Sequence, residues 1–232
     1  MFQQIKYNPE KCKMMLILQE IRGQLSDVKS GKIDGLSSIV KNLESQLGGE
    51  NEGGDSSESL SVYESITGGP LASFISTSNS IGGDLAQHAA MITAAFQAQR
   101  QFLQTASESK QPSSADIQKL LKPTADLINQ IQQFRETNRR SNVFNHLSAI
   151  SESIPALGWV SVAPTPAPYV KEMKDAGMFY TNRVLKDWKE KDGRHVEWVK
   201  NWVETLNQLQ DFVKQYHTTG QRLNWDFREL VG

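Results

Sequence analysis

The sequence predicts an all-α protein: a helical bundle with short antiparallel connections, preceded by short N-terminal helical segments and a flexible linker. Two observations predict this class. Apolar residues recur every three or four positions through most of the chain, and no segment alternates with period two for long enough to form a strand. With 232 residues, 38% of them hydrophobic, the chain can bury one good core and still leave a tail.

Residues 1–47 contain two short apolar stripes with heptad spacing, separated by SGKIDG. A stripe this short is not a stable helix alone in water, so we expect the first to pair helices between chains and form a homo-oligomer. Folding back onto the bundle is the alternative, because each stripe covers only about two heptads and sustained pairing needs about three or four. The stripe expected to oligomerise consists of Met14, Leu18, Ile21, Leu25 and Val28.

Three further segments complete the expected organisation. Residues 48–60, GGENEGGDSSESL, are rich in glycine, serine and acid, and this composition is typical of a flexible linker. Residues 61–220 form the bundle and residues 221–232 a C-terminal tail. Gly220 is expected just past the end of the last helix.

The first helices of the bundle are indicated by their stripes and by their caps. We expect Gly82 and Gly83 to form a turn and Asp84 to cap the next helix, whose stripe is Leu85, Ala89, Ile92, Phe96 and Leu103. Ser113 and Asp116 have the spacing of a capping box at the start of another helix. Pro123 is expected to kink or divide that helix.

The later helices are separated by the unusual segment SIPALGWVSVAPTPAPY. We expect Pro155 at a helix end, Trp159 and Val160 against the end of the core, and Pro168 as the first residue of the next helix. A polyproline ligand at PTPAP is the alternative, but the run is short and has no arginine anchor. The last two stripes are Tyr169, Met173, Ala176, Tyr180, Val184 and Trp188, then Val196, Val199, Val203, Leu206, Val213 and Tyr216.

Composition excludes several classes of function. The net charge of −1 provides no general attraction for nucleic acid, and the longest apolar run, MMLIL, is too short to insert into a membrane. The single cysteine, Cys12, cannot form an internal disulfide, which predicts a reducing compartment and a cytoplasmic protein.

No catalytic or metal-binding pattern is present in the sequence. The four histidines, His88, His146, His195 and His217, fall on different expected helices, and there is no second cysteine and no GxSxG. We therefore expect each histidine to be satisfied in the fold or exposed to solvent, and we expect no metal, no cofactor and no enzymatic activity. A binding role fits a rigid helical domain better.

Four long strings resemble the N-terminal helical domain of the adenylyl cyclase-associated proteins, in the same order and nearly without gaps. They begin IGGDLAQHAAMITAAFQ, RETNRRSNVFNHLSAI, PAPYVKEMKDAGMFYTNRVLKDW and HVEWVKNWVETLNQLQ. The resemblance implies a bundle of six antiparallel helices. It also implies an actin-turnover factor that acts on actin filaments together with cofilin and promotes their disassembly, at the cytoskeleton. The alternative is a scaffold that pairs with a partner coiled coil, such as that of adenylyl cyclase, without actin activity. Only IRGQLSDV echoes the family's cyclase-binding heptads.

Two basic clusters at expected helix–helix turns are candidate contacts for actin and cofilin, because filaments expose many acidic groups. The favourable interaction of Arg139 and Arg140 with the negative end of a helix dipole explains these two residues equally well without a partner. The first cluster is Asn138, Arg139, Arg140, Asn142, Asn145 and His146, and the second is Lys186, Lys189, Lys191 and Arg194.

Overall fold

The computed structural model describes residues 54–217, apart from 110–112 and 163. The chain divides into two compact units, Met1–Glu52 and Gly53–Gly232, and the described residues belong to the second. The stripe from Met14 to Val28 lies outside the described residues, so its role in oligomerisation stays a prediction, as does the tail at 221–232.

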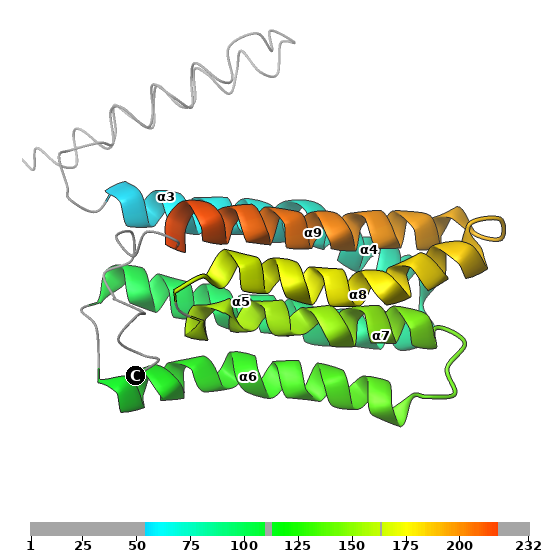
Figure 1. Ribbon diagram of the computed structural model, residues 1–232, viewed down its shortest axis with the longest axis horizontal. Helices are drawn as coiled ribbons and strands as arrows, with labels where there is room; N and C mark the ends of the chain where they lie inside the picture. Colours follow the sequence, from blue (N-terminus) through cyan, green and yellow to red (C-terminus); the bar gives the residue numbers. More distant parts are fainter. Residues whose placement is uncertain (1–53, 110–112, 163, 218–232) are drawn as a thin grey trace, which may run out of the picture. The chain divides into compact units, whose positions relative to one another are not determined.

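The first rod of the bundle consists of three helical segments that follow one another without a break (Figure 1): α3 (Gly54–Ile66), the π-helix η1 (Thr67–Leu71) and α4 (Ala72–Ile81). Residues 54–60, which we expected within the linker, thus form the first turns of α3. Pro70 lies inside η1. Proline lacks an N–H and its ring clashes with the carbonyl four residues earlier, so a wider turn accommodates it.

The remaining rods are α5 (Gly83–Glu108), α6 (Ser114–Thr137), α7 (Phe144–Ser153), α8 (Pro166–Trp188) and α9 (Gly193–His217), with the 3-10 helix η2 (Ile154–Ser161) extending α7. Consecutive rods are joined by short turns and pack as antiparallel neighbours, and α9 packs against both α8 and the first rod (Figure 1). Over the described residues, the expected all-α bundle of six antiparallel helices is confirmed.

Local signals in the sequence account for most helix ends. Gly82 and Gly83 have φ angles of 85° and 57°, a region that glycine adopts without strain, and they form the expected turn. The N-cap of α5 is Gly82, whereas Asp84 lies in the first turn and is not the cap that we expected. The hydroxyl of Ser113 accepts a hydrogen bond from the backbone N–H of Asp116, which confirms the cap of α6. Pro123 lies inside α6 without dividing it.

The proline-rich segment between α7 and α8 closes one end of the bundle. Pro155 occupies the first turn of η2, and α8 begins at Pro166, two residues before the expected Pro168. Trp159 is 1% exposed, and its indole N–H donates to Oε1 of Gln99, 3.3 Å away. The segment therefore inserts an aromatic side chain into the core, as the apolar residues around Gly158 predicted.

The centre of the bundle depends on one close helix–helix contact. A Cβ added to Gly177 of α8 would lie 2.8 Å from the carbonyl oxygen of Ala149 and 2.8 Å from Cβ of Ser153, both on α7. The Ser153 hydroxyl in turn accepts from the indole N–H of Trp202 at 2.9 Å. Glycine at 177 therefore allows the close approach of α7 and α8.

Candidate functional site

Three turns meet at one end of the bundle, because alternate connections of an antiparallel series lie at the same end (Figure 1). Nη1 of Arg194, after the α8–α9 turn, donates to the carbonyl oxygen of Ser80, before the α4–α5 turn, at 2.6 Å. Nδ2 of Asn145 on α7 donates to Oδ2 of Asp187 on α8 at 3.0 Å. The structure thus brings both predicted clusters together, and we call residues 138–146 and 186–194 the charged end.

Six exposed cations lie at the charged end: Arg139, Arg140, Lys186, Lys189, Lys191 and Arg194. Arg139 pairs with Glu136, and Arg194 pairs with Asp192. The ammonium group of Lys191 lies 5.8 Å from the centre of the Trp188 ring. Within the described part of the chain, Arg140, Lys186 and Lys189 form no ion pair. These three cations are therefore available to an acidic partner.

The other predicted residues of the first cluster differ in their positions. Asn138 is the C-cap of α6, and its side-chain amide donates to the carbonyl oxygen of Phe134 at 2.7 Å. Asn142 is exposed and Asn145 is half-buried. His146 is 0% exposed, so it lies beneath the surface of the charged end and cannot contact a partner.

A pair of buried histidines links α7 to α9 beneath this surface. Nε2 of His146 lies 2.7 Å from Nδ1 of His195, so one imidazole donates a hydrogen bond and the other accepts it. The ring of His195 also stacks on Trp188, with ring centres 3.8 Å apart. Sequence reasoning did not predict this pair, because its members are 49 residues apart and only the antiparallel topology brings them together.

Burial determines the charge state of this pair. Burial, together with the neighbouring His195, lowers the pKa of His146 to about 3. Burial also lowers the pKa of His195, against a smaller opposing effect of the Asp192 carboxylate. The hydrogen bonds from Arg194 hold the pKa of Asp192 at about 2. Both imidazoles are therefore neutral at pH 7, and the pair acts as a rigid internal link.

The exposed cations of the charged end can bind acidic groups. The imidazoles at this end are buried and bonded to each other, so neither can exchange a proton with a substrate. Over residues 54–217, apart from the gaps at 110–112 and 163, no group of three His, Cys, Asp or Glu side chains could hold a metal ion. No described helix is both long enough and apolar enough to cross a membrane.

The outer face of α8 adds apolar contacts to these cations. Met178 and Phe179 are 38% and 56% exposed, and they are the exposed large hydrophobic side chains of the described residues. The guanidinium carbon of Arg183 lies 4.4 Å from the centre of the Phe179 ring. Along α8, Phe179, Arg183 and Lys186 follow at intervals of four and three residues, so they share one face that leads to the charged end.

Sequence reasoning missed Phe179 and Arg183, although the helical periodicity of this segment already indicated an exposed aromatic residue. The apolar stripe of α8 includes Met173, Ala176 and Tyr180, and Phe179 falls outside it. An aromatic residue off the buried stripe of an amphipathic helix must either face solvent or contact a partner.

Known proteins that are similar to this chain indicate its family. The family model described as CAP, N-terminal domain, matches residues 63–221. The chain belongs to this family. It is 53% identical over 167 residues to adenylyl cyclase-associated protein 2 of Homo sapiens, which covers 72% of this chain and 35% of that protein. It is 48% identical over 161 residues to adenylyl cyclase-associated protein 1 of Bos taurus, with 69% and 34% covered. The chain therefore spans about a third of the length of these curated relatives.

Solved structures of CAP N-terminal domains have the same fold. A crystal structure of the N-terminal domain of CAP, whose description indicates variable oligomerisation, is 38% identical, with a TM-score of 0.71 over 74% of this chain and 92% of that one. The N-terminal domain of the adenylyl cyclase-associated protein from Dictyostelium discoideum is 37% identical, with a TM-score of 0.68 over 71% and 93%. The family resemblance inferred from the sequence is confirmed.

Proposed function

We propose that this CAP-family chain is a non-enzymatic actin-turnover factor that binds actin filaments together with cofilin and promotes their disassembly. The observation that carries the proposal is the set of unpaired, exposed cations at the charged end, Arg140, Lys186 and Lys189, continuous with the exposed Phe179 on α8.

Charge and apolar area have different roles in this surface. Cations opposite an acidic filament raise the rate of association and select the orientation of docking. An exposed aromatic ring and an arginine are the side chains that most often dominate the binding energy of an interface. Phe179 with Arg183 above it is such an anchor, and Lys186 connects it to the charged end.

Rigidity of the support favours binding. Ordering loops and side chains on association weakens a complex by about 0.5–1.5 kcal/mol for each immobilised long side chain. At the charged end, the His146–His195 hydrogen bond and the Arg194–Ser80 hydrogen bond already hold three turns together.

Filament disassembly requires that the domain bind the filament state that loses subunits more tightly than the intact state, since only differential affinity shifts an equilibrium.

Self-association is the second part of the proposal. The stripe that includes Leu18 and Leu25 would join several bundles, and this would raise the effective concentration of weak filament contacts. The variable oligomerisation described for a solved CAP N-terminal domain supports it. In the full chain, Leu18→Ser with Leu25→Ser should reduce the mass measured by sedimentation at tens of micromolar and should reduce disassembly potency. An unchanged mass would contradict self-association through this stripe.

A single-filament depolymerisation assay tests the proposed function. We expect this protein to accelerate shortening of cofilin-decorated filaments. Equal rates with and without the protein, with cofilin present, would contradict the actin role. That outcome would favour the alternative role, an adaptor for a partner such as adenylyl cyclase, for which the names of the relatives provide the support.

A further inference from the structure

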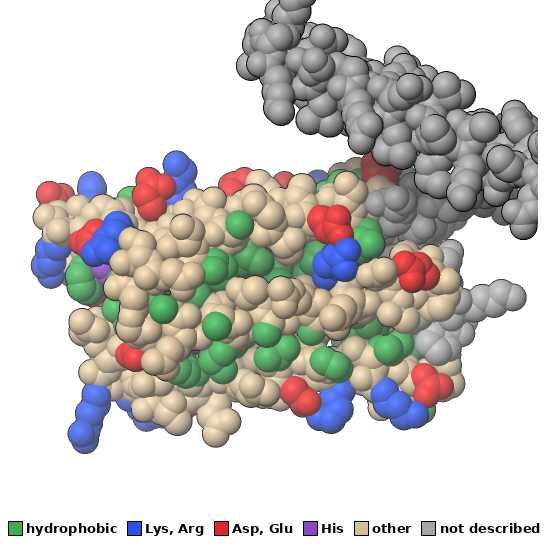
Figure 2. Space-filling view, turned by 180° about the vertical axis from the view of Figure 1, so that it is seen from behind, with side chains coloured by type: hydrophobic (Ala, Val, Ile, Leu, Met, Phe, Trp, Pro, Cys, Tyr) green, Lys and Arg blue, Asp and Glu red, His purple; other side chains and the backbone are tan. Residues whose placement is uncertain are grey.

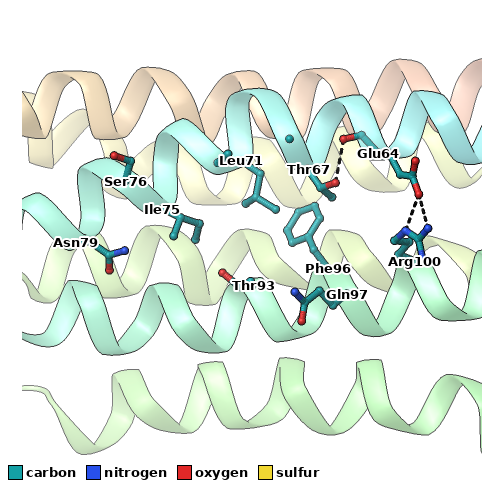
Figure 3. Close-up of a pocket in the computed structure, with 12 residues that line it drawn as sticks. Glu64, Thr67, Leu71, Ile75, Ser76, Asn79, Thr93, Phe96, Gln97 and Arg100 are labelled. Carbon is teal, nitrogen blue, oxygen red and sulfur yellow. Dashed lines mark hydrogen bonds and ion pairs between the residues drawn. The ribbon is translucent and has the colours of Figure 1, made fainter. Parts of the chain in front are cut away.

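An open groove runs between the first rod and α5, and it involves none of the residues of the charged end (Figure 3). Its volume is about 650 Å³, within the range of about 300–1,000 Å³ typical of binding pockets. Leu71 and Ile75 point toward α5, and Phe96 points back toward them. Leu71 and Phe96 are 3% and 1% exposed, so the floor of the groove is part of the packed core. Figure 2 shows the apolar side chains that gather on this side of the bundle.

The residues that line the groove follow the period of a helix. On the first rod they recur at alternating steps of three and one from Glu64 to Asn79, and on α5 at the same steps from Thr93 to Arg100. At 1.5 Å per residue, the wall on the first rod extends roughly 22 Å, about four helical turns, and the wall on α5 roughly 10 Å, about two turns. An elongated trough with two helical walls matches the helix-in-groove mode of recognition, which uses one anchor per turn.

Charge on the walls is already balanced. Nε of Arg100 donates to Oε1 of Glu64 at 2.8 Å (Figure 3), and its Nη1 donates to Oε1 of Gln104 at 3.1 Å. The remaining polar residues that line the groove, such as Thr93, Gln97 and Asn79, are neutral. An occupant with a charged stripe would find no opposite charge there, so the complementary stripe is apolar and uncharged.

We propose that this groove binds an amphipathic helix of a partner protein through an uncharged stripe of leucine-like side chains. Gly68 lines the groove one turn before Ala72, and these small residues let the partner's side chains reach the floor. The proposal is independent of filament binding, because it concerns a different surface.

The chain offers a matched pair of variants for the test. A Cβ at Gly68 or at Gly69 would have no atom within 4 Å, so both positions of η1 accept a side chain. Gly68 lines the groove and Gly69 does not. The probe is a labelled peptide with leucine at every third and fourth position and glutamine, asparagine or serine elsewhere. Its binding to the full chain is measured by fluorescence polarisation, and its helicity by circular dichroism.

We expect wild type and Gly69→Leu to bind the peptide with increased helicity, and Gly68→Leu to bind it about tenfold more weakly or worse, because overpacking a fitted contact has an effect of that size. Gln97→Glu, compared with Gln101→Glu outside the groove, is the second test and puts a charge on the neutral wall. The proposal would be overturned if the two variants of each pair bound the peptide equally well. It would also be overturned if a peptide with serine in place of leucine bound as tightly as the original peptide. Binding of the neutral dye Nile red without binding of the peptide would overturn it in favour of a small apolar ligand.

Discussion

Each end of the bundle contains a buried hydrogen-bond network, but the two ends present different surfaces. At the η2 end, where η2 packs against α5 and α6, Gln99 accepts from the hydroxyl of Tyr63 and from the indole of Trp159, and it donates to the carbonyl of Leu157 at 2.6 Å. At the charged end, His146 and His195 bond to each other at 2.7 Å.

Their surface charges differ in a way that the buried networks do not. Near the η2 end, Lys119 pairs with Asp116, and Lys122 pairs with Asp126. At the charged end, Arg140 and Lys189 are exposed and form no ion pair within the described residues. Both buried networks stabilise the fold, whereas Arg140, Lys186 and Lys189 gather at the charged end as exposed cations that form no ion pair within the described residues.

Among single substitutions at pH 7, the largest effect on stability is expected from breaking the network at the η2 end. Gln99→Ala leaves the indole N–H of Trp159 and the carbonyl of Leu157 without their partner, and both are buried. We expect the free energy of unfolding to fall by roughly 3 kcal/mol, measured by urea denaturation. Gln101→Ala, on the exposed side of the same helix, is the control and should change it by less than about 0.5 kcal/mol. Equal effects would show that the network stabilises nothing.

Acid should destabilise both ends through their histidines. Burial lowers the pKa of His146 at the charged end, and of His217 at the η2 end, from 6.5 to about 3. The unfolded chain binds more protons between these values, so stability is present above pH 6.5 and is lost as the pH falls toward 3. Each histidine should contribute a slope of about 1.4 kcal/mol per pH unit.

Urea denaturation across this pH range checks the assignment. We expect His146→Gln and His217→Gln each to reduce the pH dependence of the free energy of unfolding by that slope, whatever their effect at pH 7. A variant with the wild-type slope would contradict the neutral, buried state of the histidine that it replaces.

An intermediate effect is expected on the outer face of α8. Phe179→Ser removes an exposed ring, so the free energy of unfolding should change by less than about 0.5 kcal/mol. Binding to cofilin-decorated filaments, measured by co-sedimentation, should weaken about tenfold if this ring anchors the contact. Glu172→Ser, also exposed on α8, should bind as wild type does. Wild-type binding by Phe179→Ser would remove this face from the docking surface.

The smallest effect is expected from Arg139, whose side chain is 72% exposed and whose ion pair with Glu136 spans three residues of sequence. Pairs of this kind contribute about 0.3–0.5 kcal/mol. Arg139→Ala should therefore reduce the free energy of unfolding by no more than that, and less at high salt. A loss above about 1 kcal/mol would mean that this pair is not an ordinary surface contact.

Much of the fold could be predicted because its signals are local. Neighbouring members of the stripe from Leu85 to Leu103 are one or two helical turns apart, and the cap at Ser113 lies within one turn of its partner Asp116. The start of α3 could not be predicted, because the composition of residues 54–60 favours a linker. Burial of Ser59 and Tyr63 against the bundle outweighs this local preference and makes the segment helical. In the candidate site, the sequence predicted the cations at the two turns. It could not predict that these turns meet, or that His146 pairs with His195, because both depend on long-range packing.

The most direct test of the central claim compares the two ends under the same change of charge. Arg140→Glu with Lys189→Glu alters the charged end, and Lys119→Glu with Lys122→Glu makes the same change in net charge near the η2 end. We expect the first variant to lose affinity for cofilin-decorated filaments by at least about tenfold, with a weaker salt dependence than wild type. The second should bind within about twofold of wild type, and both should show wild-type melting. Equal affinities of the two variants for these filaments would contradict the assignment of docking to the charged end.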